Sequence, residues 1–139
     1  LAAQRAESDL ATLMRVLAGR VLAVFGRGAR DIETPTVTVG VRGTGVYVES
    51  DPEQTYFCTC YGITDVSAAK DRSSRETIEA KHHDRPVYIL AKEAEGRNIR
   101  SAPMINHTDQ ELMLVETLVG RTPPVVFPGD AYSAPRREY

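Results

Sequence analysis

The two cysteines of this chain, Cys58 and Cys60, are separated by one residue in a stretch rich in β-favouring side chains. In an extended strand such residues share a face, with Cα atoms about 6.6 Å apart and parallel Cβ directions. A disulfide requires Cβ atoms about 3.8 Å apart, so the strand would have to distort to form one. Two free thiols, or two thiolates that bind one metal, require no distortion. The cysteine pair alone leaves these alternatives open.

The chain has three histidines, His82, His83 and His107, and none lies in an apolar periodic stripe. Each alone fits a structural role, as a solvated residue at a helix end or a packing residue before a helix. Together with the two thiols, they supply a Cys2His2 set for a four-coordinate metal. Because adjacent residues point in different directions, we expect His107 and one of His82 and His83 to bind. Asp84 and Asp109 each lie near a histidine, and either carboxylate is expected to orient an imidazole.

This ligand set predicts a metal centre without fixing its identity. Two histidines can replace two thiolates on a two-iron cluster, which raises its reduction potential. We therefore expect an iron–sulfur centre that transfers electrons with a redox partner protein, and a structural zinc ion is the alternative. No P-loop, G-x-S-x-G or H-E-x-x-H motif occurs, so we do not expect an enzyme. A nucleophilic pair of Cys58 with a histidine is the minority interpretation.

Alternating side chains predict the strands that carry the thiols. Residues 37–41 alternate valine with smaller residues, as in a half-buried strand, and Gly43-Thr44-Gly45 predicts a bulge or bend. Residues 51–54 predict a turn, and residues 55–61 the returning strand of a hairpin. On this strand one face is expected to hold Tyr56, Cys58 and Cys60, and the other Phe57, Thr59 and Tyr61.

Two helices are predicted downstream. Ser73 or Ser74 is a candidate cap for a short polar helix that ends at Lys81. Thr108-Asp109-Gln110-Glu111 is a capping box that predicts a helix over 109–119. The expected apolar face of this second helix comprises Leu112, Val115, Leu118 and Val119.

Other segments give weaker signals. Residues 21–25 and 87–91 favour strands, whereas residues 8–17 fit either a helix or a strand. We divide the chain into one metal-binding domain, residues 1–121, and an extended proline-rich C-terminal tail, residues 122–139.

Bulk composition limits the class of protein. A chain of 139 residues with 42% hydrophobic and 26% charged residues is typical of one globular domain. A net charge of −2 without a basic stripe argues against nucleic-acid binding. The longest apolar run, residues 16–25, is interrupted by Gly19 and Arg20 and falls short of the roughly 18 residues of a membrane span.

Residues 33–49, ETPTVTVGVRGTGVYVE, resemble the signature strand of FecR-like domains, and residues 15–25 resemble the strand-turn-strand that precedes it. The chain is most similar to a subset of this family that carries three further motifs. These are C-T-C-Y-G at 58–62, H-H-D at 82–84 and N-H-T-D at 106–109, and together they hold every candidate ligand.

This resemblance implies a mainly β fold, a small β-sandwich or roll of FecR-like type with one or two short helices packed on it. It also implies a periplasmic or extracellular location. Two alternatives to electron transfer remain: an interaction protein stapled by zinc, and a FecR-type sensing domain for a membrane partner.

No counterpart of the family's early strands is recognised in the sequence, which predicts an unpaired edge beside residues 37–41. Residues 14–18 or the tail, residues 123–139, of a neighbouring copy could fill that edge. We therefore expect a homo-oligomer or larger assembly.

Overall fold

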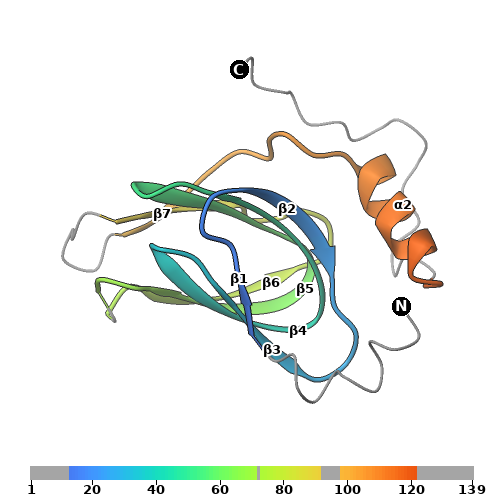
Figure 1. Ribbon diagram of the computed structural model, residues 1–139, viewed down its shortest axis with the longest axis horizontal. Coiled ribbons are helices and arrows are strands. Elements are labelled where there is room, and N and C mark those ends of the chain that lie inside the picture. The colour runs from blue at the N-terminus through green and yellow to red at the C-terminus, as the bar shows by residue number, and fades with distance from the viewer. Residues whose placement is uncertain (1–12, 72, 92–97, 122–139) are drawn as a thin grey trace.

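The computed structural model describes residues 13–71, 73–91 and 98–121, so the predicted tail lies outside the described residues. Within them the protein is mainly β, with one helix packed on the strands, as predicted (Figure 1). The elements are β1 (Leu13–Arg15), β2 (Gly19–Val24), β3 (Ala29–Glu33), β4 (Val37–Ser50), β5 (Gln54–Ala68), β6 (Arg75–Ala80), β7 (Val87–Leu90), β8 (Ile99–Ser101) and α2 (Asp109–Leu118). No helix in this described part is long and apolar enough to cross a membrane.

A long antiparallel hairpin of β4 and β5 organises the sheet, because each of these strands pairs with two others along its length. The first half of β4 pairs with β3 and its second half with β2. The start of β5 pairs with β7 and its end with β6. β1 lies parallel to β3, and β8 extends the sheet beside β7. The strands form one mixed sheet that curves into two facing layers (Figure 1), in agreement with the small, mainly β fold expected from the sequence.

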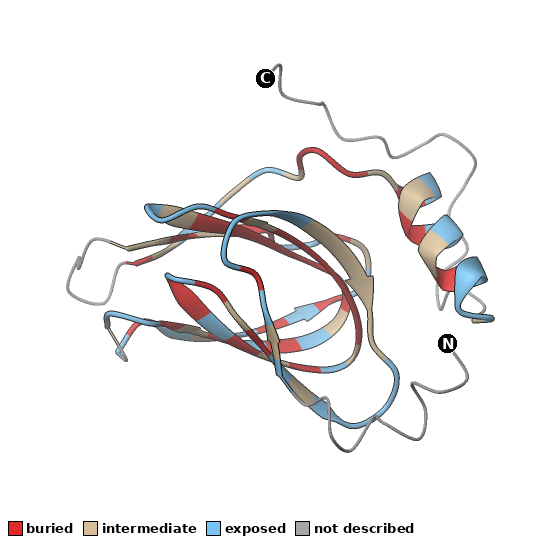
Figure 2. Cartoon of the chain, in the orientation of Figure 1, coloured by how far each residue is buried: buried red, intermediate tan, exposed pale blue. Residues whose placement is uncertain are grey.

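The main hydrophobic core lies between these layers. Alternation along β4 sends its valines inward, where they meet apolar residues of the opposite layer. Figure 2 shows the buried positions along the strands. The principal core residues are Ile32, Val37, Val39, Val41, Val46, Val48, Phe57, Val66, Ile78, Val87 and Ile89.

A second buried cluster lies on the other face of the β4–β5 hairpin, towards α2. It comprises Tyr47, Tyr56, Cys58, Cys60, Tyr61, Ile105 and Leu112. Tyr61 was predicted on the Phe57 face, and this is wrong. The register shifts at Gly45, so that Cys60 is an extra residue in β5 and forms a bulge, which turns Tyr61 to the cysteine face. The predicted irregularity at residues 43–45 is confirmed.

The structure also assigns segments whose predictions were wrong, open or absent. The short helix expected to end at Lys81 is instead strand β6, whose buried Ile78 and Ala80 alternate with exposed residues. Buried and exposed residues alternate in the second half of β6, as in a strand, and this pattern outweighed the helix-capping signal of Ser73 or Ser74. Residues 13–15 form a strand, which is one of the two alternatives that the sequence left open. Strands β3 and β8 are short and contain charged residues, so their patterns did not predict them.

Strand β3 also corrects the predicted open edge. Residues 38–41 of β4 pair with β3 on one side and with β5 on the other. In the same chain, β1 pairs with the outer side of β3. An edge beside residues 37–41 is therefore filled from within the chain, and self-association stays a prediction that needs another surface.

Helix α2 begins at the predicted capping box. The Thr108 hydroxyl oxygen accepts a hydrogen bond from the Glu111 amide at 3.1 Å. Asp109 and Glu111 lie in the first turn, where negative charge is favourable beside the positive end of the helix dipole. This cap fixes the residue at which the chain leaves the 102–107 segment and becomes helical.

The buried face of α2 differs in part from the predicted apolar face. Leu112 is fully buried, but Leu118 is 65% exposed. The fully buried Glu116 accepts a hydrogen bond from the Tyr61 hydroxyl and pairs with Arg121 Nε at 3.1 Å. Burial, followed by the hydrogen bond to Glu116, raises the pKa of Tyr61 above its ordinary value. This polar contact holds the C-terminal half of α2 against β5.

Replacing Tyr61 by phenylalanine is expected to lower the free energy of unfolding by about 1–3 kcal/mol, because the buried Glu116 carboxylate loses a hydrogen bond. Urea unfolding of the two proteins measures the difference. Thr117→Ala, on the exposed side of α2, is the control and is expected to cost less than about 1 kcal/mol. Equal losses would show that the Tyr61–Glu116 contact does not hold the helix.

Candidate metal centre

Strand β5 presents Cys58 and Cys60 to the cluster near α2. Both side chains are fully buried, and both thiols are free of disulfides. Thr59 points to the opposite face, where its hydroxyl lies 2.8 Å from that of Thr64. The alternation of the strand therefore places the two sulfur atoms on one face, as predicted.

The turn after β6 positions the first histidine. Here the Asp84 carboxylate accepts hydrogen bonds from the amides of Lys81 and His82, at 2.6 and 3.4 Å. It therefore orders the backbone of the turn, whereas it was expected to orient an imidazole. The His83 amide donates to the Cys60 carbonyl oxygen at 2.9 Å, and His83 has a φ of 52°. Such left-handed backbone is uncommon outside glycine and concentrates at functional sites.

The segment that enters α2 positions the second histidine. His107 is fully buried, and its Nδ1 donates to the Ile105 carbonyl oxygen at 2.6 Å. This bond assigns the ring proton to Nδ1 and leaves the lone pair of Nε2 available to a metal. The preceding residue, Asn106, is also left-handed, with a φ of 61°, and its side-chain amide donates to Glu49 at 2.8 Å.

Tyr47 completes the support of His107, a role that no pattern in the sequence indicated. Its ring stacks on the His107 imidazole with centroids 4.3 Å apart and an interplanar angle of 14°. The available signal was positional, because Tyr47 lies opposite Cys58 in the β4–β5 register. Residues directly opposite on antiparallel strands share a face, but that register was not known from sequence.

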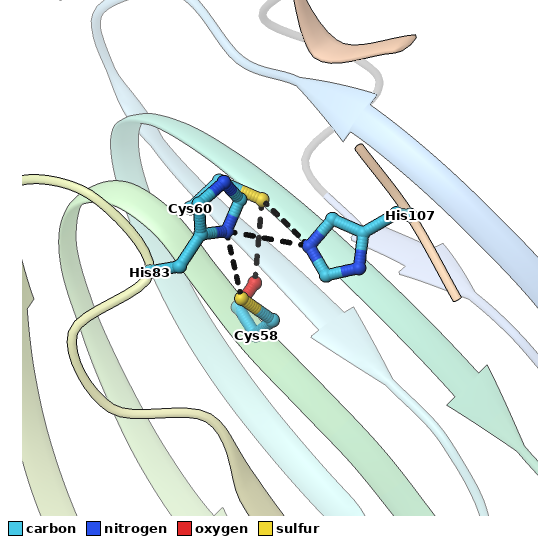
Figure 3. A group of neighbouring side chains, drawn as sticks. All are labelled: Cys58, Cys60, His83 and His107. Atoms are coloured by element: carbon cyan, nitrogen blue, oxygen red, sulfur yellow. Dashed lines mark hydrogen bonds between the residues drawn. The ribbon is translucent and has the colours of Figure 1, made fainter. Parts of the chain in front are cut away.

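The four predicted ligands Cys58, Cys60, His83 and His107 converge on one point (Figure 3). His83 Nδ1 lies 3.2 Å from Cys58 Sγ and 3.3 Å from His107 Nε2. His107 Nε2 lies 3.7 Å from Cys60 Sγ. All four candidate ligand atoms lie within 4.8 Å of one another. The structure thus selects His83 over His82 for this group.

These distances fit one tetrahedral ion. Zinc binds sulfur at about 2.3 Å and imidazole nitrogen at about 2.0–2.1 Å, so tetrahedral angles give separations of about 3.3 Å for N···N and about 3.6 Å for S···N. The corresponding distances here are 3.3 Å between the two nitrogens, and 3.2 and 3.7 Å between nitrogen and sulfur. Small side-chain shifts would bring all four atoms onto a common ion.

A two-iron cluster fits the same residues less well. In a two-iron centre with two histidines, both imidazoles bind one iron and both thiolates bind the other. Sulfur and nitrogen ligands then lie on opposite sides of the cluster. Here each sulfur is within 3.7 Å of an imidazole nitrogen, so the thiolate and imidazole pairs would have to move apart to admit the cluster.

Asp109 supports the centre from outside the ligand set. It is 1% exposed, and its two carboxylate oxygens lie 2.8 Å from His83 Nε2 and 2.8 Å from His82 Nε2. A carboxylate on Nε2 assigns that proton and leaves the lone pair of His83 Nδ1 on the side of Cys58 Sγ. His82, the alternative candidate ligand predicted from the sequence, instead contacts the Asp109 carboxylate.

The buried thiols and imidazoles of this group shift one another's pKa values. Burial alone raises the pKa of the Cys58 thiol, but its interactions with Cys60, His107 and His83 outweigh burial and lower that pKa. Burial and the neighbouring Cys58 raise the pKa of Cys60. Burial lowers the pKa of His83, but the Cys58 and Asp109 contacts outweigh it and raise that pKa. The first thiol is therefore readily ionised, and a metal would displace the proton of the second.

Cys58, His83 and Asp109 also have the order of a nucleophile, base and orienting carboxylate. However, the Cys58 sulfur is fully buried. Three surface cavities, of about 240, 400 and 300 Å³, are lined by other residues. None of these three cavities, within the described part of the chain, brings a substrate to the Cys58 sulfur.

Comparison with known proteins identifies the fold. No family model matches the chain, and no curated protein matches it. Two crystal structures from Parabacteroides distasonis, provisionally assigned as an anti-sigma factor, share the fold at 14% and 15% identity, each with a TM-score of 0.50. The match covers 88% of this chain but only 66% and 65% of those chains.

The two adjacent histidines are expected to differ in effect. His83→Ala should weaken metal binding by more than about 100-fold, because it removes a ligand rather than a residue outside the ligand set. His82→Ala should leave one equivalent bound, since its Nε2 lies on the Asp109 carboxylate and is not one of the four converging ligand atoms. Competition against a chelator of known affinity measures both variants. Equal and negligible losses would place the fourth ligand elsewhere.

Proposed function

We propose that this chain is a metal-binding domain in which one ion, zinc in preference to others, is held by Cys58, Cys60, His83 and His107. The observation that supports this most strongly is the mutual distance of the four ligand atoms, all within 4.8 Å. Tetrahedral coordination by two sulfurs and two nitrogens is typical of zinc. Two thiolates also neutralise a divalent cation, as a fully buried position requires.

The proposed role of the ion is structural. Its four ligands leave no open position for a substrate or water, which distinguishes structural from catalytic zinc sites. They come from three segments: strand β5, the 81–84 turn, and residues 106–109 at the start of α2. The ion would therefore fasten the turn and the helix to the sheet, as in the zinc-stapled alternative of the sequence analysis.

We further propose that the stapled domain serves as an extracytoplasmic binding or sensing module for a membrane partner. The support is the FecR-like sequence signature, together with the fold shared with the two provisional anti-sigma factor structures. The signature implies an extracytoplasmic module, and the provisional assignment of the two structures as an anti-sigma factor fits a sensing role. Periplasmic or extracellular location remains part of this proposal.

Electron transfer by a two-iron cluster is the competing proposal, supported by the ligand types alone. Three measurements on the full chain distinguish a single zinc ion from a two-iron cluster: the metal content, the acid-labile sulfide content and the visible spectrum. A single zinc per chain, without sulfide or colour, is expected. Two irons and two sulfides per chain, with strong visible absorption, would instead support the electron-transfer module.

A further inference from the structure

The proposed centre is enclosed, so an ion needs a route to reach it. Each of the four ligands is at most 3% exposed, and Tyr47, which stacks on His107, is 4% exposed. The His82 side chain is 27% exposed and contacts Asp109, whose own side chain is 1% exposed. Among the side chains described above as contacting a ligand side chain or Asp109, that of His82 is the most exposed.

A second group of metal-binding atoms lies along this direction. His82 Nε2, His83 Nε2 and the Asp109 carboxylate lie within 4.8 Å of one another. The rings of His82 and His83 have centroids 5.0 Å apart. The left-handed backbone at His83 allows two consecutive imidazoles to approach the same carboxylate. His83 thus belongs to both groups, with Nδ1 in the inner one and Nε2 in the outer one.

We propose that divalent ions enter and leave the inner centre through the outer pair of His82 and Asp109. This inference rests on the proposed function. An arriving ion would be bound by His82 Nε2 and the Asp109 carboxylate while retaining water on its exposed side. Nitrogen and oxygen donors of this kind bind a soft or borderline ion less tightly than thiolates do. The ion therefore moves inwards to Cys58 and Cys60.

A route differs from a ligand in its kinetic signature. The outer pair contacts the ion only in passing, and when His82 is removed Asp109 still contacts His83 Nε2 through its other oxygen, so both the empty and the loaded centre keep their four ligands. The rates of entry and release must then fall by the same factor, because their ratio is the equilibrium constant. Loss of a ligand instead speeds release and lowers affinity.

The experiment uses the full chain, stripped of metal, with Co²⁺ as the probe. Thiolate-to-cobalt absorption reports the inner centre, because the outer pair contains no sulfur. Stopped-flow mixing with Co²⁺ gives the entry rate, and mixing the loaded protein with excess chelator gives the release rate. The variants are His82→Ala and, as a control from the same turn, Lys81→Ala, whose side chain is exposed.

We expect His82→Ala to slow entry and release about tenfold each, equivalent to about 1.4 kcal/mol in the barrier, with one Co²⁺ still bound at the end. Lys81→Ala should match the wild type. Unchanged rates in His82→Ala would overturn the route, as would faster release with lost affinity. If the wild type never develops thiolate-to-cobalt absorption, the proposed centre itself fails, and the route fails with it.

Discussion

Cys58→Ser and Cys60→Ser are each expected to abolish stoichiometric metal binding. Both sulfurs are buried in the same group of ligand atoms, and a serine hydroxyl is a much poorer ligand for a borderline-soft ion. The variants should also lose the stabilisation that a bound ion gives the folded state. This is about 4 kcal/mol when free metal exceeds the dissociation constant a thousandfold.

Elemental analysis and urea unfolding in the presence of metal measure these two effects. Thr59→Ser is a matched control, because Thr59 lies between the cysteines on the same strand but faces Thr64 on the other side. It should retain one full equivalent of metal. If either cysteine variant also retains a full equivalent, that cysteine is not a ligand.

Removal of the ion from the wild-type chain is expected to lower its melting temperature by about 10–15 °C. The estimate follows from a loss of about 4 kcal/mol in a domain of this size. Calorimetry with and without chelator measures it, and readdition of Zn²⁺ should restore the original value. A cysteine variant is the control, because chelator should not change its melting temperature.

The loss of stability on removal of the ion should also be confined to part of the domain. Hydrogen exchange is expected to quicken most in the 81–84 turn and in α2, since these segments are joined to β5 by the proposed ion. Hydrogen exchange in β3 and β6 should change least, because the main core stabilises these two strands without a metal. Uniform acceleration across the chain would contradict a stapling role.

The sequence predicted the parts of the centre that depend on local pattern. Strand alternation placed Cys58 and Cys60 on one face, and the capping box placed the start of α2 directly after His107. The mainly β fold was also predicted correctly. These features follow from periodicity and from hydrogen bonds between residues close together in the chain.

Features that depend on long-range contacts could not be predicted in this way. The bulge at Cys60 depends on register with β4, and it moved Tyr61 to the cysteine face. Because His83 has left-handed backbone, both adjacent imidazoles contact Asp109, contrary to the expectation that neighbours diverge. Burial of Glu116 on α2 likewise depends on Tyr61, 55 residues earlier in the chain.

X-ray absorption at the metal edge of the loaded full chain tests the central claim most directly, because it reports the number and type of ligand atoms. One ion bound by two sulfurs at about 2.3 Å and two nitrogens at about 2.0–2.1 Å is the predicted result. A metal–metal distance with bridging sulfide, or a first shell without sulfur, would contradict a single ion held by Cys58, Cys60, His83 and His107.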